Sequence, residues 1–138
     1  MRNVWITGGN RGIGLELVKG FLEKGDNVTV LCRSTSSELL SSNVKIFNNI
    51  ELTNPDTFQA ANEYARSNSI DILINNAGIL RNEQIDSLTN DSFQSIESQF
   101  QINALAPLRL VSTLSHSFRE GTKLVFLTSR MGSIEDNT

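Results

Sequence analysis

The sequence contains very little of several residue types that define common classes of protein. It has one cysteine, one histidine and two prolines among 138 residues. Because a single cysteine, Cys32, cannot form an internal disulfide, we expect no disulfide framework and take the cytoplasm as the default location. The one histidine, His116, is most simply a surface residue of a helix, so no metal site is expected.

Long apolar runs and an excess of basic residues are also missing. No apolar run approaches the roughly 18 to 20 residues that cross a bilayer, and no charged leader with an apolar core precedes the first strand-like residues. With a formal charge of -3, the chain offers no basic stripe for a nucleic-acid backbone. We therefore expect neither a membrane nor a nucleic acid as partner.

What is present is the composition of a globular domain. Apolar residues make up 38% of the chain and charged residues 20%, and a chain of this length can bury a core of its own. There is no internal repeat, and the serine-rich stretch 34–42 is short enough to be a loop. Residues 1–138 are therefore expected to form one domain.

Short apolar runs alternate with longer segments of helical periodicity, which is typical of βαβ units that build a parallel sheet. We expect strands at 4–6, 28–32, 44–47, 71–75 and 124–128, and helices at 12–24, 54–66 and 100–114. A loop rich in Asn, Asp and Ser should precede the last helix, whose face is marked by Phe100, Ala104, Leu108 and Val111 and which Pro107 should bend. The expected fold class is α/β, a Rossmann-like doubly wound parallel sheet of strand order 3-2-1-4-5, with a ligand crevice beyond the carboxyl ends of strands one and four.

Three glycines lie between the first strand and the first helix. Gly8, Gly12 and Gly14 leave room for a tight turn and for a pyrophosphate near the helix N-terminus, where backbone N–H groups and the helix dipole favour an anion. The alternative is an ordinary glycine turn, and the spacing Gly-x3-Gly-x-Gly departs from the commoner Gly-x-Gly-x2-Gly fingerprint. The glycines alone leave both interpretations open.

The residues around these glycines resemble a known family. The segment 7–14 is similar to the cofactor motif of short-chain dehydrogenases/reductases, and 75–78 is similar to that family's second motif, after strand four. The segments 101–104 and 128–132 resemble its helix asparagine and its strand-five motif. The resemblance covers the whole chain but only the first half of a family member. It implies that a dinucleotide is bound by Thr7, Gly8, Asn10, Arg11, Gly12, Ile13, Gly14, Asn76, Ala77 and Gly78.

The resemblance also bears on which dinucleotide is bound. NAD-preferring relatives carry an acidic residue at the end of strand two, whereas an arginine there accommodates a 2′-phosphate. This chain has Arg33 and no acid at that point, and Arg11 supplies a second cation on the same side. We therefore expect NADP, with NAD as the alternative. Glu51, followed by Leu52, takes the place of the family's aspartate near the adenine.

The family's catalytic residues imply the reaction chemistry. A serine hydroxyl holds the substrate oxygen, a tyrosine transfers the proton, and a lysine lowers the tyrosine pKa. Ser129 matches the serine and Asn103 the helix asparagine, whereas the tyrosine and lysine positions would fall past Thr138. The only tyrosine, Tyr64, is followed four residues later by asparagine and is expected to pack or lie on the surface. The 138 residues alone are therefore expected to be inactive.

Two functions from different classes are compatible with this pattern. The first is an NADP-dependent oxidoreductase that passes hydride between the nicotinamide and a small carbonyl or alcohol substrate. The alternative is a dinucleotide-binding sensor or scaffold without catalysis. Family members commonly pair through the helix after strand four and the next one, so a homo-oligomer is expected. Two more strands follow strand five in the full family sheet, so residues 124–127 are expected to form an exposed apolar edge here.

Overall fold

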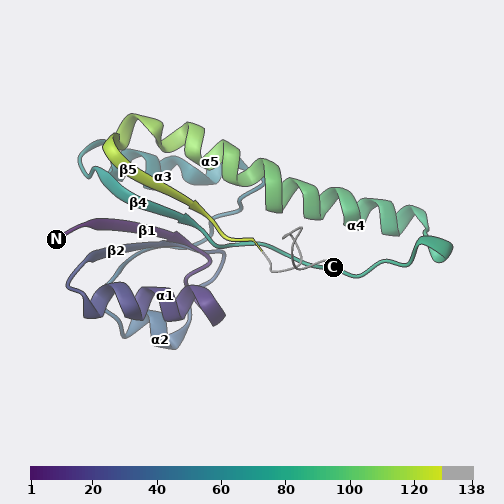
Figure 1. Cartoon of the computed structure of the whole chain (residues 1–138), viewed down its shortest axis with the longest axis horizontal. Helices are drawn as coiled ribbons and strands as arrows, with labels where there is room; N and C mark the ends of the chain where they lie inside the picture. Colours follow the sequence, from purple (N-terminus) through teal and green to yellow (C-terminus); the bar gives the residue numbers. More distant parts are fainter. Residues whose placement is uncertain (129–138) are drawn as a thin grey trace, which may run out of the picture.

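Five strands form one parallel sheet in the order β3-β2-β1-β4-β5 (Figure 1). The computed structural model of the chain describes residues 1–128. The central strand pairs on both sides, with Val4 opposite Val28 and Ile72. The predicted fold class and strand order are confirmed. The strands are β1 (Asn3–Thr7), β2 (Asn27–Leu31), β3 (Lys45–Phe47), β4 (Ile70–Asn75) and β5 (Phe118–Phe126).

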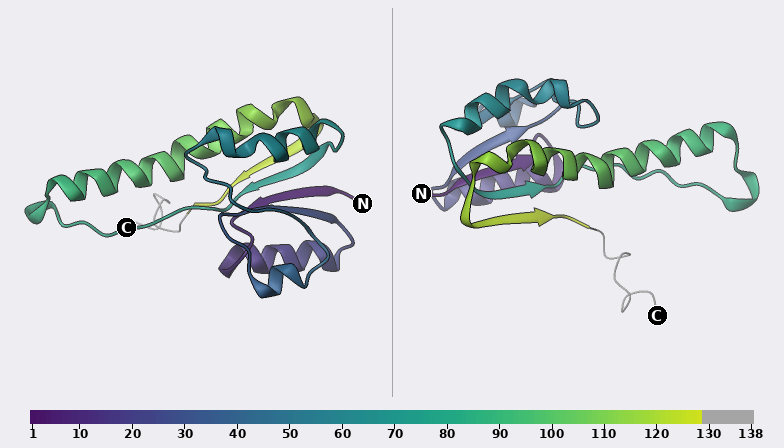
Figure 2. Two further views of the ribbon diagram at one scale, coloured as in Figure 1. Left: turned by 180° about the vertical axis from the view of Figure 1, so that it is seen from behind. Right: turned by 90° about the horizontal axis from the view of Figure 1, so that it is seen from above.

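Helices cover both faces of the sheet, which is why its central strands are apolar along nearly their whole length. On one face lie α1 (Gly12–Glu23) and α2 (Ser37–Leu40). On the other lie α5 (Ala106–Leu114) and α3 (Gln59–Arg66), the latter preceded by the 3-10 turn η1 (Pro55–Phe58) (Figures 1 and 2). Side chains of β1 alternate between the two layers: Val4 and Ile6 join the core beneath α1, and Trp5 joins the core beneath α3 and α5.

Trp5 is the largest fully buried side chain of the core beneath α3 and α5, which we call the second core. Its ring centroid lies 6.2 Å from that of Phe47 and 6.1 Å from that of Tyr64. The ammonium group of Lys45 lies 5.2 Å from the Tyr64 ring centroid, in range of a cation–π contact. Of the two positions expected for Tyr64, packing or surface, the structure shows packing against the core.

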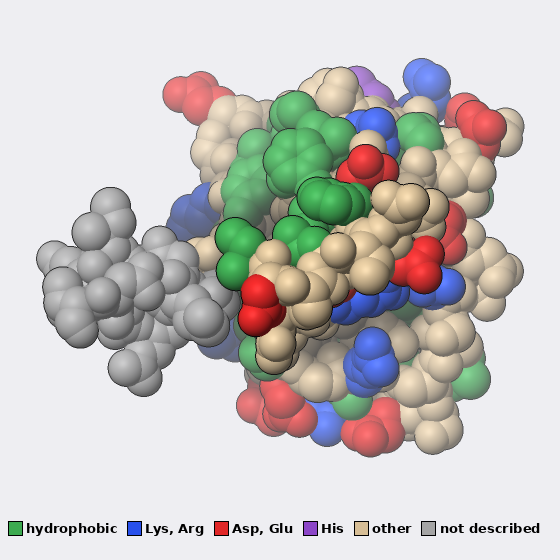
Figure 3. All heavy atoms as spheres, turned by 90° about the vertical axis from the view of Figure 1, so that its right-hand side faces the viewer, with side chains coloured by type: hydrophobic (Ala, Val, Ile, Leu, Met, Phe, Trp, Pro, Cys, Tyr) green, Lys and Arg blue, Asp and Glu red, His purple; other side chains and the backbone are tan. Residues whose placement is uncertain are grey.

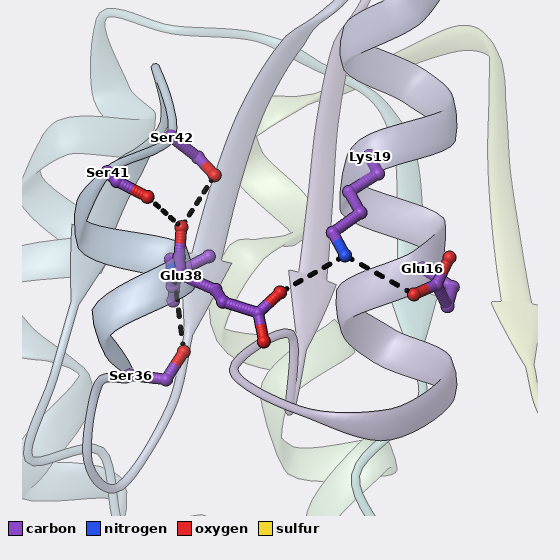
Figure 4. Close-up of polar contacts among 7 residues, drawn as sticks. Glu16, Lys19, Ser36, Glu38, Ser41 and Ser42 are labelled. Atoms are coloured by element: carbon purple, nitrogen blue, oxygen red, sulfur yellow. Dashed lines mark hydrogen bonds and ion pairs between the residues drawn. The ribbon is translucent and has the colours of Figure 1, made fainter.

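The serine-rich stretch 34–42 is more than a loop, because it contains the one-turn helix α2. The Ser36 hydroxyl accepts the Leu39 N–H at 3.2 Å, and the Ser41 and Ser42 hydroxyls donate to the Glu38 carbonyl at 2.9 and 2.8 Å (Figure 4). The Glu38 carboxylate in turn pairs with Lys19 of α1 at 3.1 Å, an exposed contact that contributes little to stability. Serines that favour a loop by composition here cap a helix.

A helix also replaces the last part, from residue 90, of the loop expected before residue 100. α4 (Asn90–Phe100) continues through the π-helical turn η3 (Gln101–Leu105) into α5, and this continuous rod extends beyond the sheet (Figures 1 and 2). It begins at Thr89, whose hydroxyl accepts the Ser92 N–H at 3.3 Å while the Ser92 hydroxyl accepts the Thr89 N–H at 3.1 Å. This reciprocal cap explains how a stretch rich in polar residues starts a helix.

Three of the four residues predicted to mark the apolar face of this helix, Phe100, Ala104 and Leu108, are exposed, and only Val111 packs against the core beneath α3 and α5. Ala106, Leu110 and Leu114 are fully buried against the sheet, whereas Phe100 and Leu108 are 60% and 63% exposed. Both stripes are apolar, so periodicity alone could not decide which of them packs. Figure 3 shows hydrophobic side chains gathered on one side of the molecule in a view from the α4 end.

The π-helical turn η3 ends two residues before Pro107, the residue that was predicted to bend the helix. Proline has no N–H and so cannot donate to the Asn103 carbonyl four residues earlier. The preceding turn is widened instead, and the Ala106 N–H bonds to the carbonyl of Gln101, five residues back. The widened turn carries Asn103.

β5 begins at Phe118, earlier than the predicted 124, and ends at Phe126. A register shift interrupts its pairing with β4, and Gly121 has a left-handed φ of 90° within this irregular part. Within residues 1–128, β5 pairs with β4 alone, and Leu124 and Phe126 are 40% and 53% exposed. The predicted apolar edge is therefore present. Among these residues, no helix combines the length and the apolar character of a membrane span.

Candidate functional site

The carboxyl ends of β1 and β4 lie side by side at one edge of the sheet. β1 ends at Thr7 and leads into the glycine loop and α1, and β4 ends at Asn75 and leads into residues 76–78. The chain turns to opposite faces of the sheet after these two strands (Figure 1). Ligands of doubly wound folds bind at such a switch point. The two segments predicted to bind the cofactor are therefore neighbours in space.

Four hydrogen bonds fix these two segments to each other. The buried Thr7 hydroxyl accepts the backbone N–H groups of Asn76 and Ala77, each at 3.0 Å. The Asn76 amide nitrogen donates to the carbonyls of Thr7 and Gly8, each at 3.1 Å. A bond of this kind contributes about 0.5–1.5 kcal/mol to stability, and leaving its buried partner unpaired costs more. We call this arrangement the Thr7–Asn76 latch.

The glycines are required by the geometry of the loop. Gly8 and Gly12 have left-handed φ values of 67° and 56°, which residues with a Cβ rarely adopt. A Cβ on Gly14 would overlap the Gly8 carbonyl oxygen and lie 2.5 Å from the Asn76 amide nitrogen. The first turn of α1 therefore packs directly on the latch. The Gly8 N–H bonds to the Leu31 carbonyl at 2.8 Å, which ties the same loop to the end of β2.

The N-terminus of α1 presents its backbone N–H groups without a capping side chain. Arg11 occupies the cap position and makes no side-chain cap bond, and the first turn contains no acidic residue. The first N–H groups of a helix have no partner within it and favour an anion. Gly12, Ile13 and the Arg11 side chain are exposed, and nothing lies within 4 Å of the Cβ position of Gly12. The diphosphate of a dinucleotide fits this open helix end.

Arg33 and Glu51 meet beyond the carboxyl ends of β2 and β3. Arg33 follows β2 and Glu51 follows β3, and the guanidinium Nε lies 3.5 Å from a carboxylate oxygen of Glu51. The two side chains are 79% and 45% exposed. Leu52, the next predicted residue, packs partly buried against the second core. Cys32, just before Arg33, is buried, and burial raises the pKa of its thiol, so it is not a reactive group here.

Asn103 is held against the loop that follows β4. Its side-chain oxygen accepts the Ile79 N–H at 2.8 Å, and its amide nitrogen donates to the Ile79 carbonyl at 2.6 Å. A Cβ on Gly78 would lie 3.0 Å from the same oxygen, so the glycine permits this approach. Both polar atoms of Asn103 are therefore used to join the widened helical turn to residues 78–79.

The structure brings most of the predicted site residues to one edge of the sheet. They form three groups, and the residues within each group contact one another. The latch and glycine loop, the Arg33–Glu51 pair and the Asn103–Ile79 contact all follow strand ends or the helix beside them. Asn10 is half-buried in the glycine loop. Ser129 lies outside the described residues, as do Arg130 and Gly132. Within residues 1–128, no group of three His, Cys, Asp or Glu side chains could hold a metal ion.

One residue of the site was missed by the sequence analysis. The Thr57 hydroxyl accepts the Glu51 N–H at 3.0 Å and lies 3.1 Å from the Glu51 carbonyl, so it fixes the backbone that carries this acid. Thr57 belongs to the Asn54-Pro55 cap, where Asn54 accepts the Asp56 N–H at 3.1 Å. The cap signature was visible in the sequence, but its contact with Glu51 was not.

Several known proteins are similar to this chain over nearly its whole length. Over its whole length the chain is 26% identical to 1-hydroxy-2-glutathionyl-2-methyl-3-butene dehydrogenase of Rhodococcus sp. strain AD45, of which it covers 61%. It covers 60% of an NADPH-bound carbonyl reductase from chicken fatty liver, with 99% of the chain matched, 28% identity and a TM-score of 0.81. A Burkholderia multivorans structure described as a short-chain dehydrogenase/reductase, with bound NADP, matches 99% of the chain at 25% identity and a TM-score of 0.82, with 62% of that structure covered.

The chain thus spans about three fifths of the length of these relatives. The model of the short chain dehydrogenase family matches residues 2–137, nearly the whole sequence. Because this match covers nearly all of the sequence, the chain belongs to the short-chain dehydrogenase family.

Proposed function

We propose that this chain is the cofactor-binding part of an NADP-dependent oxidoreductase that acts on a small carbonyl or alcohol substrate. The observation that carries the proposal is the open N-terminus of α1, which the Thr7–Asn76 latch and the close approach at Gly14 hold beside the ends of β1 and β4. The NADP and NADPH bound by two relatives of the same fold support it. When bound, the nicotinamide supplies or accepts a hydride.

Different residues of the chain bind different parts of the dinucleotide. The N–H groups at the start of α1 bind the diphosphate, helped by Arg11, and Asn10 and Ile13 flank it. Arg33 binds the 2′-phosphate, since the residues that directly follow β2 in the sequence supply this cation and no acid of their own. Glu51 and Leu52 lie at the adenine, and Asn76, Ala77 and Gly78 line the path toward the nicotinamide.

Two further residues serve the substrate side. Asn103 positions the loop after β4 through its paired contacts with Ile79. Ser129, beyond the described residues, provides the hydroxyl that holds the substrate oxygen. The only tyrosine of the chain, Tyr64, packs with Trp5 and Phe47 in the core beneath α3 and α5, so the 138 residues offer no tyrosine for proton transfer at the site. We infer that this chain binds the dinucleotide but does not turn substrate over by itself.

The test is a calorimetric titration of the 138-residue chain with NADPH and with NADH. We expect tighter binding of NADPH, and Arg33→Glu should abolish or reverse that preference while leaving the melting temperature unchanged. Arg66→Glu is the matched control, because Arg66 is also exposed and lies 3.4 Å from a glutamate, Glu63, but at the end of α3 that precedes β4. Tighter binding of NADH by the unmodified chain would remove the argument for NADP. Binding of neither dinucleotide would remove the proposed function.

A further inference from the structure

The neighbouring strand supplies a carboxylate to the arginine that follows β2. Glu51 comes from the segment after β3, and its carboxylate oxygen lies 3.5 Å from Nε of Arg33. β3 is the neighbour of β2 in the sheet, so the two residues leave the sheet at the same edge. No acid follows β2 in the sequence, but Glu51, which follows β3, brings a carboxylate to the same position in the folded chain.

The backbone around this pair is tied together on both sides. The Ile50 N–H bonds to the Cys32 carbonyl and the Asn49 N–H to the Arg33 carbonyl, each at 3.0 Å. Asn49 adopts a left-handed φ of 56°, and Ile50 is only 3% exposed. The Thr57 hydroxyl also accepts the Glu51 N–H. The backbone of Glu51 is therefore held in place by hydrogen bonds, and this fixed backbone directs the carboxylate toward Arg33.

Two opposite effects on a 2′-phosphate follow from this placement. Glu51 orients Arg33, which favours phosphate binding, but exposed ion pairs of this kind contribute little. Glu51 is also a negative charge beside a group that carries nearly two negative charges at neutral pH, and it competes with that group for the same guanidinium. Because the repulsion acts on a doubly charged ligand and the orienting effect is small, competition dominates.

We propose that Glu51 is a specificity-determining residue, which weakens binding of the 2′-phosphate at Arg33 and so narrows the difference between NADPH and NADH. The inference rests on the proposed function, because it takes Arg33 as the phosphate ligand. Glu51→Gln removes the charge and keeps an acceptor oxygen, so NADPH should bind about three- to tenfold more tightly than to the unmodified chain, and any change in NADH affinity should be smaller than this gain.

The experiment is a titration of the 138-residue chain and its variants with NADPH and NADH at low and high salt. The gain of Glu51→Gln should shrink as the Debye length falls from about 10 Å at 0.1 M to 3 Å at 1 M ionic strength. Glu38→Gln is the control, since it removes the same charge from an exposed carboxylate that pairs with Lys19, and it should change both affinities less than twofold.

The outcomes separate this inference from the proposed function. If both dinucleotides bind and Glu51→Gln leaves NADPH affinity unchanged or lowers it, the inference is overturned and the proposed function stands. An equal gain for NADPH and NADH would also overturn it, since the 2′-phosphate is the only difference between them. If the unmodified chain binds neither dinucleotide, both are overturned. Thermal melting of each variant confirms that affinities are compared between folded chains.

Discussion

Replacement of Gly14 by alanine tests whether the glycine loop and α1 must touch for a dinucleotide to bind. Gly14 and Gly20 lie in the same helix, but a Cβ on Gly14 would overlap the Gly8 carbonyl oxygen, whereas a Cβ on Gly20 would meet nothing within 4 Å. Gly14→Ala and Gly20→Ala therefore add the same methyl group, in the first case where other atoms fill the space and in the second where the space is free.

The expected magnitudes follow from that difference. Alanine is favoured over glycine within a helix by about 0.8–1 kcal/mol, so Gly20→Ala should stabilise the fold by up to that amount. In Gly14→Ala the gain is outweighed, because overpacking costs about 1–3 kcal/mol and displacement of the Asn76 amide loses hydrogen bonds of about 1 kcal/mol each. Since the Asn76 amide makes two such bonds, we expect a net destabilisation of about 2–4 kcal/mol. Dinucleotide affinity should fall at least tenfold, which corresponds to about 1.4 kcal/mol.

Urea unfolding followed by Trp5 fluorescence measures the stability, since this side chain is 1% exposed in the folded chain. Calorimetric titration with NADPH measures the affinity. Equal NADPH affinities for the two variants would refute the reasoning, because the contact between α1 and the latch would then be a structural turn without a role in binding.

Three further predictions concern stability, catalysis and association. Arg2 donates to the Asp26 carboxylate through its guanidinium and its backbone N–H, and these bonds hold the pKa of that carboxyl below its usual value. The stability that they contribute is present at neutral pH and is lost as the pH falls through the pKa of Asp26 in the folded chain. Asp26→Asn should lower the urea midpoint at pH 7 and flatten its acid dependence, and an unchanged acid slope would contradict this. The 138-residue chain should consume no NADPH above background with a panel of aldehydes and ketones, because general acid catalysis is worth about 10² to 10⁴ in rate; turnover that is lost on Ser129→Ala would show that another group supplies the proton. The chain should self-associate in a concentration series followed by light scattering, and Phe126→Lys on the exposed edge of β5 should reduce this, whereas a concentration-independent monomer would contradict it.

The sheet and the core of the site could be predicted because their signals are local. Apolar runs at the strands and glycines at Gly8, Gly12 and Gly14 need no knowledge of the rest of the chain. Parallel pairing then brings Thr7 and Asn75 to one edge whatever the details of the helices.

Features that depend on contacts between distant residues could not be predicted. The start of α4 rests on a cap between Thr89 and Ser92, which is hidden in a polar stretch that is equally typical of a loop. Which apolar stripe of α5 faces the sheet is decided by packing, because both stripes have helical spacing. The approach of Glu51 to Arg33 depends on the register of β2 and β3 and on a left-handed Asn49, none of which is written in the two residues themselves.

The Thr7–Asn76 latch also has a consequence for how the protein folds. Its partners are 68 to 70 residues apart in sequence, so the latch closes only after β4 has docked beside β1, a contact between distant parts of the chain that forms slowly. An intermediate that contains only β1, α1 and β2 would hold the glycine loop without the latch. A ligand bound at this loop then recognises the assembled sheet, and at one hundred times its dissociation constant it would stabilise the native state by about 2.7 kcal/mol. Ligand binding during refolding would therefore report the moment at which β4 joins the sheet.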